Sequence, residues 1–291
     1  MSSAAGDAGT VSDPVVWVNG APGTSVSVLD RGLQFGDGLF ETIACVGGRP
    51  RFLPLHLERL EFGCERLQIA VPSLDRLRSE IEELAGQVER SIIKLLVTGG
   101  TALARGYGRT GRETATRITI RYSWPQQADS QRQDGVMART LSMRLGENPR
   151  LAGLKHCNRL EQVLARAELA AHPDVGEGLL MSSSGNLVSG TMSNVFLVRD
   201  SALLTPRTDL CGVSGVMRRV VLREARRVGI PARECELRSP DVASADEVFF
   251  TNARVGILPA KEVDGRLLTP GPITRHLQTV MAPLLGDRVD A

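Results

Sequence analysis

The sequence lacks any apolar run long enough to cross a membrane, so we expect a soluble protein with no membrane partner. Its five cysteines are odd in number, widely scattered and never arranged as CxxC, which argues against a zinc ribbon or a disulfide framework. Reduced thiols of this kind favour a cytoplasmic location. Residues 1–13 have neither the basic nor the apolar region of a secretory signal and are expected to form a disordered lead-in.

Several common motifs are missing as well. There is no HExxH, no GxSxG and no EF-hand loop, so metalloprotease, hydrolase and calcium-binding functions lack support, and we expect no metal site. The glycine-rich residues 99–112 are not followed by Gly-Lys-Ser/Thr, which excludes a Walker A loop. A net charge of +2 implies no partner by itself, and the arginines of residues 218–227 alternate with valines at helical spacing. We interpret them as a solvated helix face and expect no nucleic-acid partner.

The length and the hydrophobic patterning indicate an α/β protein with two domains. At 291 residues the chain exceeds the usual size of one domain. We predict a domain at residues 14–124, a polar, glutamine-rich linker at 125–134 and a second domain at 135–291. Apolar residues spaced by three and four predict helices, and short β-branched runs predict strands. The expected helices cover residues 53–67, the segment after residue 155, and 216–228; the expected strands cover 15–19, 26–28, 39–46, 92–98, 117–122, 136–144, 178–181, 187–198 and 247–251.

The most informative segment is Leu-Lys-His-Cys-Asn-Arg-Leu-Glu at residues 154–161, which places Lys155 just ahead of an amphipathic helix. A lysine amine forms imines, and desolvation or a nearby cation lowers its pKa enough to make it nucleophilic. The LKHxNRLEQ pattern resembles the cofactor-lysine segment of the aminodeoxychorismate lyases. These enzymes belong to the fold type IV pyridoxal-phosphate family, together with the branched-chain and D-amino acid aminotransferases. The resemblance implies that Lys155 carries pyridoxal 5'-phosphate as a Schiff base and then moves protons.

A second segment, residues 30–42, has the family pattern DRGxQFGDGxFET. Its glycines also suit a tight turn, because they permit backbone angles that other residues resist. In the family this stretch lines the active site near a dimer interface. The resemblance therefore implies Phe35 and Phe40 as walls of the substrate pocket.

Three further segments supply candidate ligands for the cofactor phosphate. Arg59 lies in the helix-forming sequence HLERL, and its planar guanidinium matches phosphate oxygens. Residues 214–218 combine a glycine with a helix start, where free backbone N–H groups and the helix dipole favour an anion. The resemblance implies that Arg59 binds the phosphate, with further contacts from Gly215, Val216, Met217, Asn252 and Ala253. A turn residue is an equal interpretation of Asn252.

The segment Ser-Gly-Thr-Met-Ser-Asn-Val-Phe at residues 189–196 departs from the family pattern. The family usually has glutamate where this chain has Ser189, and that glutamate keeps the pyridine nitrogen protonated so that the ring is a strong electron sink. The resemblance makes Ser189 and Asn194 cofactor-binding residues. A serine hydroxyl supplies a hydrogen bond but no charge, which harms a transaminase more than a lyase that expels its electrons with a leaving group. Ser189 is also consistent with a member that has weakened or lost its chemistry.

The resemblance also implies a substrate and an assembly. The RGY element places Arg105 and Tyr107 near the substrate carboxylates, although a mobile surface loop explains the same glycines. The expected architecture is two α/β domains with the cofactor in the cleft between them, in a homodimer. The function we favour is a lyase that converts 4-amino-4-deoxychorismate to 4-aminobenzoate and pyruvate, a step towards folate. Alternatives are an aminotransferase of branched-chain or D-amino acids, and a PLP-binding protein without catalysis.

Overall fold

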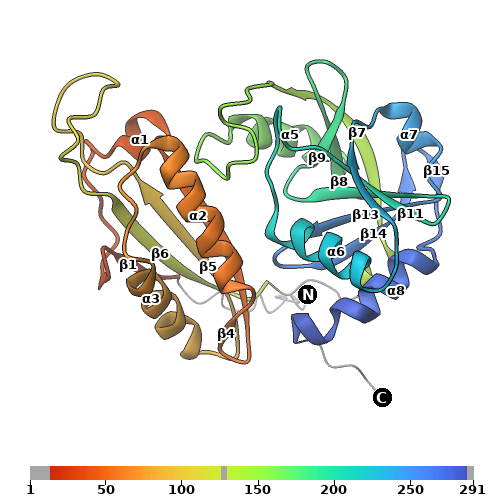
Figure 1. Ribbon diagram of the computed structural model, residues 1–291, viewed down its shortest axis with the longest axis horizontal. Helices are drawn as coiled ribbons and strands as arrows, with labels where there is room; N and C mark the ends of the chain where they lie inside the picture. Colours follow the sequence, from red (N-terminus) through yellow and green to blue (C-terminus); the bar gives the residue numbers. More distant parts are fainter. Residues whose placement is uncertain (1–13, 126–129, 287–291) are drawn as a thin grey trace, which may run out of the picture.

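The computed structural model describes residues 14–125 and 130–286, and the predicted lead-in at residues 1–13 lies outside them. Two mixed α/β halves lie side by side (Figure 1). The first half is built on a six-stranded antiparallel sheet in the order β2-β1-β6-β5-β3-β4. Its strands are β1 (Val15–Val18), β2 (Ala21–Pro22), β3 (Gly38–Val46), β4 (Arg49–Pro50), β5 (Arg90–Thr98) and β6 (Thr116–Ser123).

Two helices, α2 (Leu53–Leu67) and α3 (Leu74–Gly86), bury their apolar faces in the core of this half. In α2 the buried positions include Leu53, Leu57, Leu60 and Cys64, as the helical spacing predicts. The helix has a proline in its first turn and ends at Gln68, whose left-handed backbone lets its N–H bond the carbonyls of the last turn.

The second half is a nine-stranded mixed sheet in the order β12-β11-β10-β13-β14-β7-β8-β9, with β15 paired to β14. The helices α6 and α8 pack in one core cluster and α5 in another. The strands are β7 (Val136–Leu145), β8 (Val175–Ser182), β9 (Leu187–Gly190), β10 (Asn194–Arg199), β11 (Ala202–Pro206), β12 (Ala232–Cys235), β13 (Glu247–Asn252), β14 (Gly256–Val263) and β15 (Arg266–Leu267). The helices are α5 (Leu160–Ala170), α6 (Val216–Arg227), α7 (Ser239–Ala243) and α8 (Pro272–Met281), followed by the 3₁₀ turn η1 (Pro283–Leu285).

The predicted fold class, α/β with two domains, is confirmed, whereas three local predictions differ. Residues 26–28 are not a strand but an exposed extended segment. The predicted strand at 187–198 is interrupted by a turn at 191–193, which separates β9 from β10. Arg218 is buried against Glu234 rather than solvated like the other arginines of α6.

The domain boundaries remain a prediction. The two sheets end and begin at Ser123 and Val136, and the described part of the segment between them contains the short helix α4 (Ser130–Asp134). Residues 126–129 of the predicted linker lie outside the described part of the chain. Among the residues described, no helix is both long and apolar enough to span a bilayer.

Candidate active site

Lys155 lies where the two halves meet, in the loop between β7 and α5. The backbone N–H of Phe40 donates to the carbonyl of Lys155 at 2.9 Å, and the N–H of Cys157 donates to the carbonyl of Gly38 at 2.9 Å. The start of β3 is therefore fixed against the lysine loop by a short antiparallel bridge. This pairing brings Phe40 and Lys155, which are 115 positions apart in sequence (155 − 40), into direct contact.

The amine of Lys155 lies close to other positively charged side chains. Its Nζ is 4.1 Å from the centre of the Phe40 ring, and two further cations, Lys94 and Arg159, lie within 5.4 and 5.9 Å of the same centre. Burial lowers the pKa of Lys155 to about 7, Arg59, Arg159 and Lys94 act in the same direction, and Glu41 opposes them. The amine is thus close to half neutral at neutral pH, as a proton acceptor must be.

Lys94 and Arg159 were not among the residues predicted for the site. Arg159 is held by its own loop, because Nε donates to the carbonyl of His156 at 2.8 Å and Nη2 to that of Leu154 at 3.0 Å. Burial lowers the pKa of Arg159 to about 10. Both residues had a signal in the sequence: Lys94 interrupts an apolar strand, and Arg159 lies inside the LKHxNRLEQ pattern.

Arg59 joins the two halves. Its Nη1 donates to the carbonyl of Ser214 at 2.9 Å, just before α6, while Nε donates to Glu41 Oε1 at 2.8 Å and Nη2 to Glu41 Oε2. The guanidinium therefore lies beside the loop that leads into α6. Because Arg59 also lowers the pKa of Lys155, the amine and this loop belong to one site.

The N-terminus of α6 forms a cradle for an anion. Its N-cap is Gly215, and no side chain among the described residues caps the first turn, so the N–H groups of Val216 and Met217 are open to a ligand. Asn194 braces the loop by donating from Nδ2 to the carbonyl of Val213 at 2.9 Å. A Cβ on Gly215 would lie 2.0 Å from Asn194 Oδ1, so only glycine fits between the helix and this side chain.

Gly215→Ala should therefore damage the cradle. We expect its free energy of unfolding to fall by about 1–3 kcal/mol, which is typical of an added carbon in a filled space. We also expect weaker binding of inorganic phosphate. Urea unfolding and phosphate titration of the variant would measure both effects. Gly86→Ala is the matched control, since nothing lies within 4 Å of a Cβ there; equal behaviour of the two variants would contradict the prediction.

Asn252 and Ala253 lie next to this cradle. Asn194 is the register partner of Thr251, so the end of β13 lies beside the start of β10. The side-chain oxygen of Asn252 accepts the N–H groups of Arg254 and Val255, each at 3.0 Å, and its Nδ2 donates to the carbonyl of Met192 at 3.4 Å. Asn252 therefore stabilises a turn, which was one of the two interpretations of this residue from the sequence. Ala253 packs against the cluster that contains Val216 and Met217.

Ser189 lies in β9, opposite Leu180 of β8, and is almost fully buried. Its hydroxyl donates to the carbonyl of Gly190 at 2.8 Å. The buried carboxylate of Glu177 accepts hydrogen bonds from the backbone N–H of Thr191 and the hydroxyl of Ser193. These bonds hold the turn between β9 and β10. Ser189 itself contributes no charge.

The remaining predicted residues gather elsewhere. Tyr107 and Phe35 contact each other at 5.2 Å between ring centres, and Arg105 is exposed on the same loop as Tyr107. This loop projects from the first half, away from the second (Figure 1). The described contacts do not join these three residues to Lys155, so they form a separate group at the edge of the first half.

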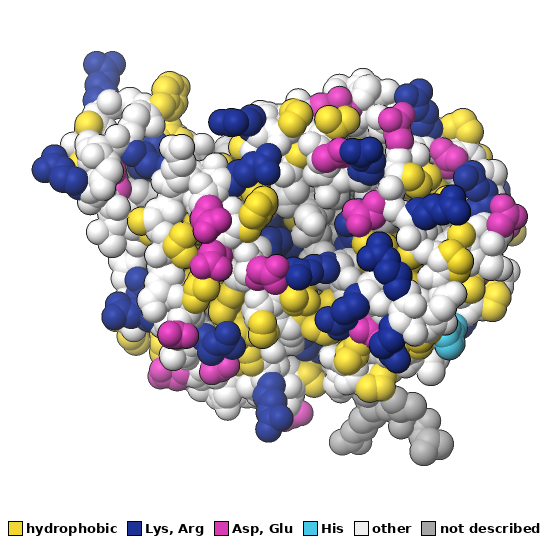
Figure 2. Space-filling model, in the orientation of Figure 1, with side chains coloured by type: hydrophobic (Ala, Val, Ile, Leu, Met, Phe, Trp, Pro, Cys, Tyr) yellow, Lys and Arg dark blue, Asp and Glu magenta, His cyan; other side chains and the backbone are white. Residues whose placement is uncertain are grey.

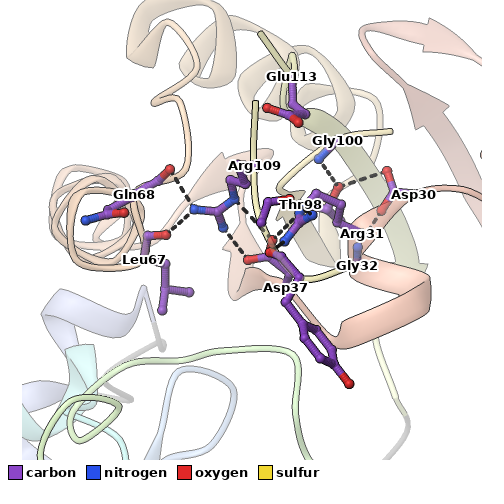
Figure 3. A network of polar contacts seen from close by, with 12 residues as sticks. Asp30, Arg31, Gly32, Asp37, Leu67, Gln68, Thr98, Gly100, Arg109 and Glu113 are labelled. Atoms are coloured by element: carbon purple, nitrogen blue, oxygen red, sulfur yellow. Dashed lines mark hydrogen bonds and ion pairs between the residues drawn. The ribbon is translucent and has the colours of Figure 1, made fainter. Parts of the chain in front are cut away.

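A network of arginines fixes the base of that loop (Figure 3). Asp37 accepts from Arg31 Nε at 2.7 Å and from Arg109, while Arg31 donates from Nη2 to the carbonyl of Tyr107 at 2.7 Å. Arg109 also donates to the carbonyl of Gln68 at 2.8 Å, at the end of α2. The FGDG segment, which includes Asp37, therefore determines where the loop leaves the domain.

Three features lie along the junction of the two halves. They are the Lys155 amine of lowered pKa, the nearby cations Lys94, Arg159 and Arg59, and the free N–H groups at the start of α6. In the space-filling view the surface is hollowed between the two halves, with Lys and Arg side chains in and around the hollow (Figure 2). Such a site suits a small ligand that carries several negative charges and a group that reacts with an amine.

Comparisons with known proteins identify the family of the chain. The family model described as amino-transferase class IV matches residues 38–263. The chain is 34% identical over 266 residues to the aminodeoxychorismate lyase of Vibrio harveyi, covering 90% of this chain and 97% of that one. It is 29% identical over 268 residues to the D-alanine aminotransferase of Bacillus licheniformis, with 88% and 90% covered.

Solved structures have the same architecture. The 4-amino-4-deoxychorismate lyase of Pseudomonas aeruginosa superposes with a TM-score of 0.89 at 41% identity, covering 92% of this chain and 98% of that one. The branched-chain amino acid aminotransferase of Escherichia coli gives a TM-score of 0.82 at 24% identity and shares the fold. The chain therefore belongs to the class IV aminotransferase family, and its fold is that of the fold type IV pyridoxal-phosphate enzymes.

Proposed function

We propose that this protein is a pyridoxal-phosphate-dependent lyase that converts 4-amino-4-deoxychorismate to 4-aminobenzoate and pyruvate, a step towards folate. The observation that carries the proposal is the amine of Lys155, whose pKa is lowered to about 7 at a junction lined by Lys94, Arg159 and Arg59. The reaction needs a base at the amine-bearing carbon and cations for two substrate carboxylates, and this site supplies both. The likeness to lyases of Vibrio harveyi and Pseudomonas aeruginosa supports it.

The residues of the site fit pyridoxal 5'-phosphate. Gly215 leaves the start of α6 open, and the two free N–H groups there, with Arg59, match a phosphate. Lys155 is the amine that would bond the aldehyde. We propose that Ser189, Asn194, Asn252 and Ala253, together with Val216 and Met217 of the α6 start, complete the cofactor site. When bound, the cofactor supplies the electron sink for breaking a bond at the amine-bearing carbon.

The chain's own groups do the rest of the chemistry. Neutral Lys155 accepts the proton from the amine-bearing carbon of the substrate at Nζ. The electron pair of that C–H bond completes the aromatic ring as the C–O bond to the neighbouring enolpyruvyl group breaks. The enolate released in this way takes up a proton at its methylene carbon and becomes pyruvate. Lys94 and Arg159 hold a substrate carboxylate and so orient the C–H bond towards Nζ. Phe40 forms the wall behind the amine. The predicted substrate contacts of Phe35, Arg105 and Tyr107 stay a prediction, because these three residues lie apart from Lys155 in the described contacts.

A product assay tests the proposal. The protein is loaded with pyridoxal phosphate, aminodeoxychorismate is generated in place by its synthase, and 4-aminobenzoate is quantified against a control without the protein. We expect enzyme-dependent 4-aminobenzoate and equimolar pyruvate. No product from cofactor-loaded protein would overturn the lyase and favour a member that has lost its chemistry.

Aminotransferase activity on branched-chain or D-amino acids is the alternative, supported by the likeness to the D-alanine aminotransferase. Ser189 argues against it, because its hydroxyl is bonded to the carbonyl of Gly190 and brings no negative charge to the ring nitrogen. Ser189→Glu should therefore raise transamination of D-alanine with 2-oxoglutarate above the level of the unmodified protein. Ser189→Gln is the neutral control, and an equal rate in both variants would show that charge at this position does not select the reaction.

The pH profile should follow the titration of Lys155. Its pKa of about 7 means that the amine is protonated, and inactive as a base, below that pH. The turnover number kcat for 4-aminobenzoate should therefore rise with pH and be half-maximal near 7. Measurement at saturating substrate between pH 5.5 and 8.5 would check this, and a profile that falls across this range would contradict the role of Lys155 as the base.

We also propose that two copies of the chain form a homodimer. On α5, Leu160, Val163 and Leu164 share one face at helical spacing and are 77%, 60% and 58% exposed. Val28 and Leu33 are exposed in the first domain near the projecting loop. Apolar side chains grouped in this way favour a protein contact. Sedimentation equilibrium should give twice the mass of the chain, and Leu160→Glu with Leu164→Glu should give the monomer.

The proposed location is the cytoplasm. All five cysteines are free thiols in the described structure, four of them with their pKa raised to about 11 or 12 by burial. Buried, unpaired thiols suit a reducing compartment. The proposed partner is a small-molecule substrate.

A further inference from the structure

Glu41 is a buried carboxylate at the centre of the site for which neither the sequence nor the proposed chemistry provides a role. It lies on β3 next to Phe40, and only 1% of its surface is exposed. Both oxygens are used: Oε1 accepts from Arg59 Nε at 2.8 Å, and Oε2 accepts from Arg59 Nη2 and lies 2.6 Å from His56 Nδ1. Glu41 is thus the two-point anchor of Arg59.

We propose that Glu41 is a positioning residue that holds the Arg59 guanidinium at the domain junction, so that its remaining N–H groups face an anion at the start of α6. This inference rests on the proposed cofactor, whose phosphate is that anion. Glu41 touches neither cofactor nor substrate in this proposal, and its effect on the phosphate is exerted through Arg59.

The hydrogen bonds of Arg59 define what is left for a ligand. A guanidinium has five N–H groups. Two bind Glu41 and one binds the carbonyl of Ser214. The other two, one on each terminal nitrogen, have no protein partner in the described parts of the chain. Since an arginine side chain is otherwise flexible, the anchor at Glu41 selects the orientation in which these two groups are free on the side of α6.

The charges around Glu41 keep its carboxyl group ionised. Burial raises the pKa of this carboxyl, but Arg59 and His56 outweigh burial and lower the pKa to about 2. Burial lowers the pKa of His56, and Glu41, whose Oε2 lies 2.6 Å from His56 Nδ1, opposes that lowering. Lys155 is the next cation, and Glu41 opposes the lowering of its pKa.

Binding of two ligands that differ only in the phosphate tests the proposal. Pyridoxal phosphate and pyridoxal are titrated into the cofactor-free protein by absorbance. For Glu41→Gln we expect the affinity for pyridoxal phosphate to fall at least tenfold and the affinity for pyridoxal to change less than twofold. Glu41→Asp keeps the negative charge but has a side chain one carbon shorter. It should therefore lose affinity for pyridoxal phosphate and not for pyridoxal, which separates the effect of position from the effect of charge.

Glu80→Gln is the matched control, because Glu80 is a buried carboxylate that pairs with Arg117 at 2.9 Å in the same domain. It should leave both affinities unchanged. In an Arg59→Ala background, Glu41→Gln should cause no further loss. Unchanged binding of pyridoxal phosphate by both Glu41 variants, or an equal loss for both ligands, would overturn the inference. Unmodified protein that binds the two ligands alike would instead overturn the proposed cofactor and, with it, this role of Glu41.

Discussion

Lys155→Ala should lower the rate of 4-aminobenzoate formation by about a thousandfold or more, because a positioned base alone contributes about 10²–10⁴-fold. The variant also loses the amine that would bond the cofactor. No other lysine replaces it: Lys94 lies further from the Phe40 ring, with its Nζ 5.4 Å from the ring centre against 4.1 Å for Lys155. Initial rates at saturating pyridoxal phosphate and substrate would measure the effect.

Lys94→Met is the matched control for this experiment. It removes a cation near the same aromatic ring but leaves the base in place, so we expect KM to rise several-fold while the maximal kcat at high pH falls far less than in Lys155→Ala. Because Lys94 contributes to the lowered pKa of Lys155, the half-maximal pH of kcat should rise in the same variant. Unchanged turnover by Lys155→Ala would remove this lysine from the mechanism altogether.

Part of the fold could be predicted from the sequence where an element has a strong period of its own, although α3 was missed despite its buried Leu77, Ile81 and Leu84, which are spaced by four and three. The buried positions of α2 recur every three or four residues, and the nine residues of β3 pair with β5 along their whole length. The predictions of local structure failed where tertiary contacts determine the conformation of a segment. Val26 and Val28 have β-branched side chains but lie exposed, in a segment that is not part of a strand. The turn at 191–193 that splits β9 from β10 depends on Glu177, which the turn meets only in the folded sheet.

The site could be predicted in part for the same reason. Lys155, Arg59 and Gly215 lie in short motifs, and the structure joins them along one junction. Two of their supporting residues, Glu41 and Arg159, lie inside the DRGxQFGDGxFET and LKHxNRLEQ patterns, but the patterns do not say which side chains they support. Glu41 becomes the partner of Arg59 only because β3 packs beside α2, and Lys94 reaches Phe40 because β5 pairs with β3. A single sequence contains no signal for such cross-strand and cross-domain contacts.

Arg59→Ala should cost much more stability than the loss of a surface arginine, because it leaves the Glu41 carboxylate buried without its guanidinium partner. Removing one partner of a buried ion pair typically costs about 3–5 kcal/mol. We expect a loss of this size in the free energy of unfolding, measured with urea on the cofactor-free protein at pH 7. At pH 7 the pair contributes fully, since the pKa of Glu41 is about 2 and lies below that of an unfolded glutamate. Its contribution should disappear as the pH falls from about 5 towards 2.

Two variants sharpen this result. Glu41→Gln combined with Arg59→Ala removes the buried charge, so it should recover part of the stability that Arg59→Ala loses, although neither should bind pyridoxal phosphate as the unmodified protein does. Arg219→Ala removes the exposed pair between Arg219 of α6 and Glu58 of α2, at 2.9 Å, and should cost less than about 1 kcal/mol. If Arg59→Ala costs no more than Arg219→Ala, Glu41 is not held in place by Arg59, and the junction between the two domains depends on other contacts.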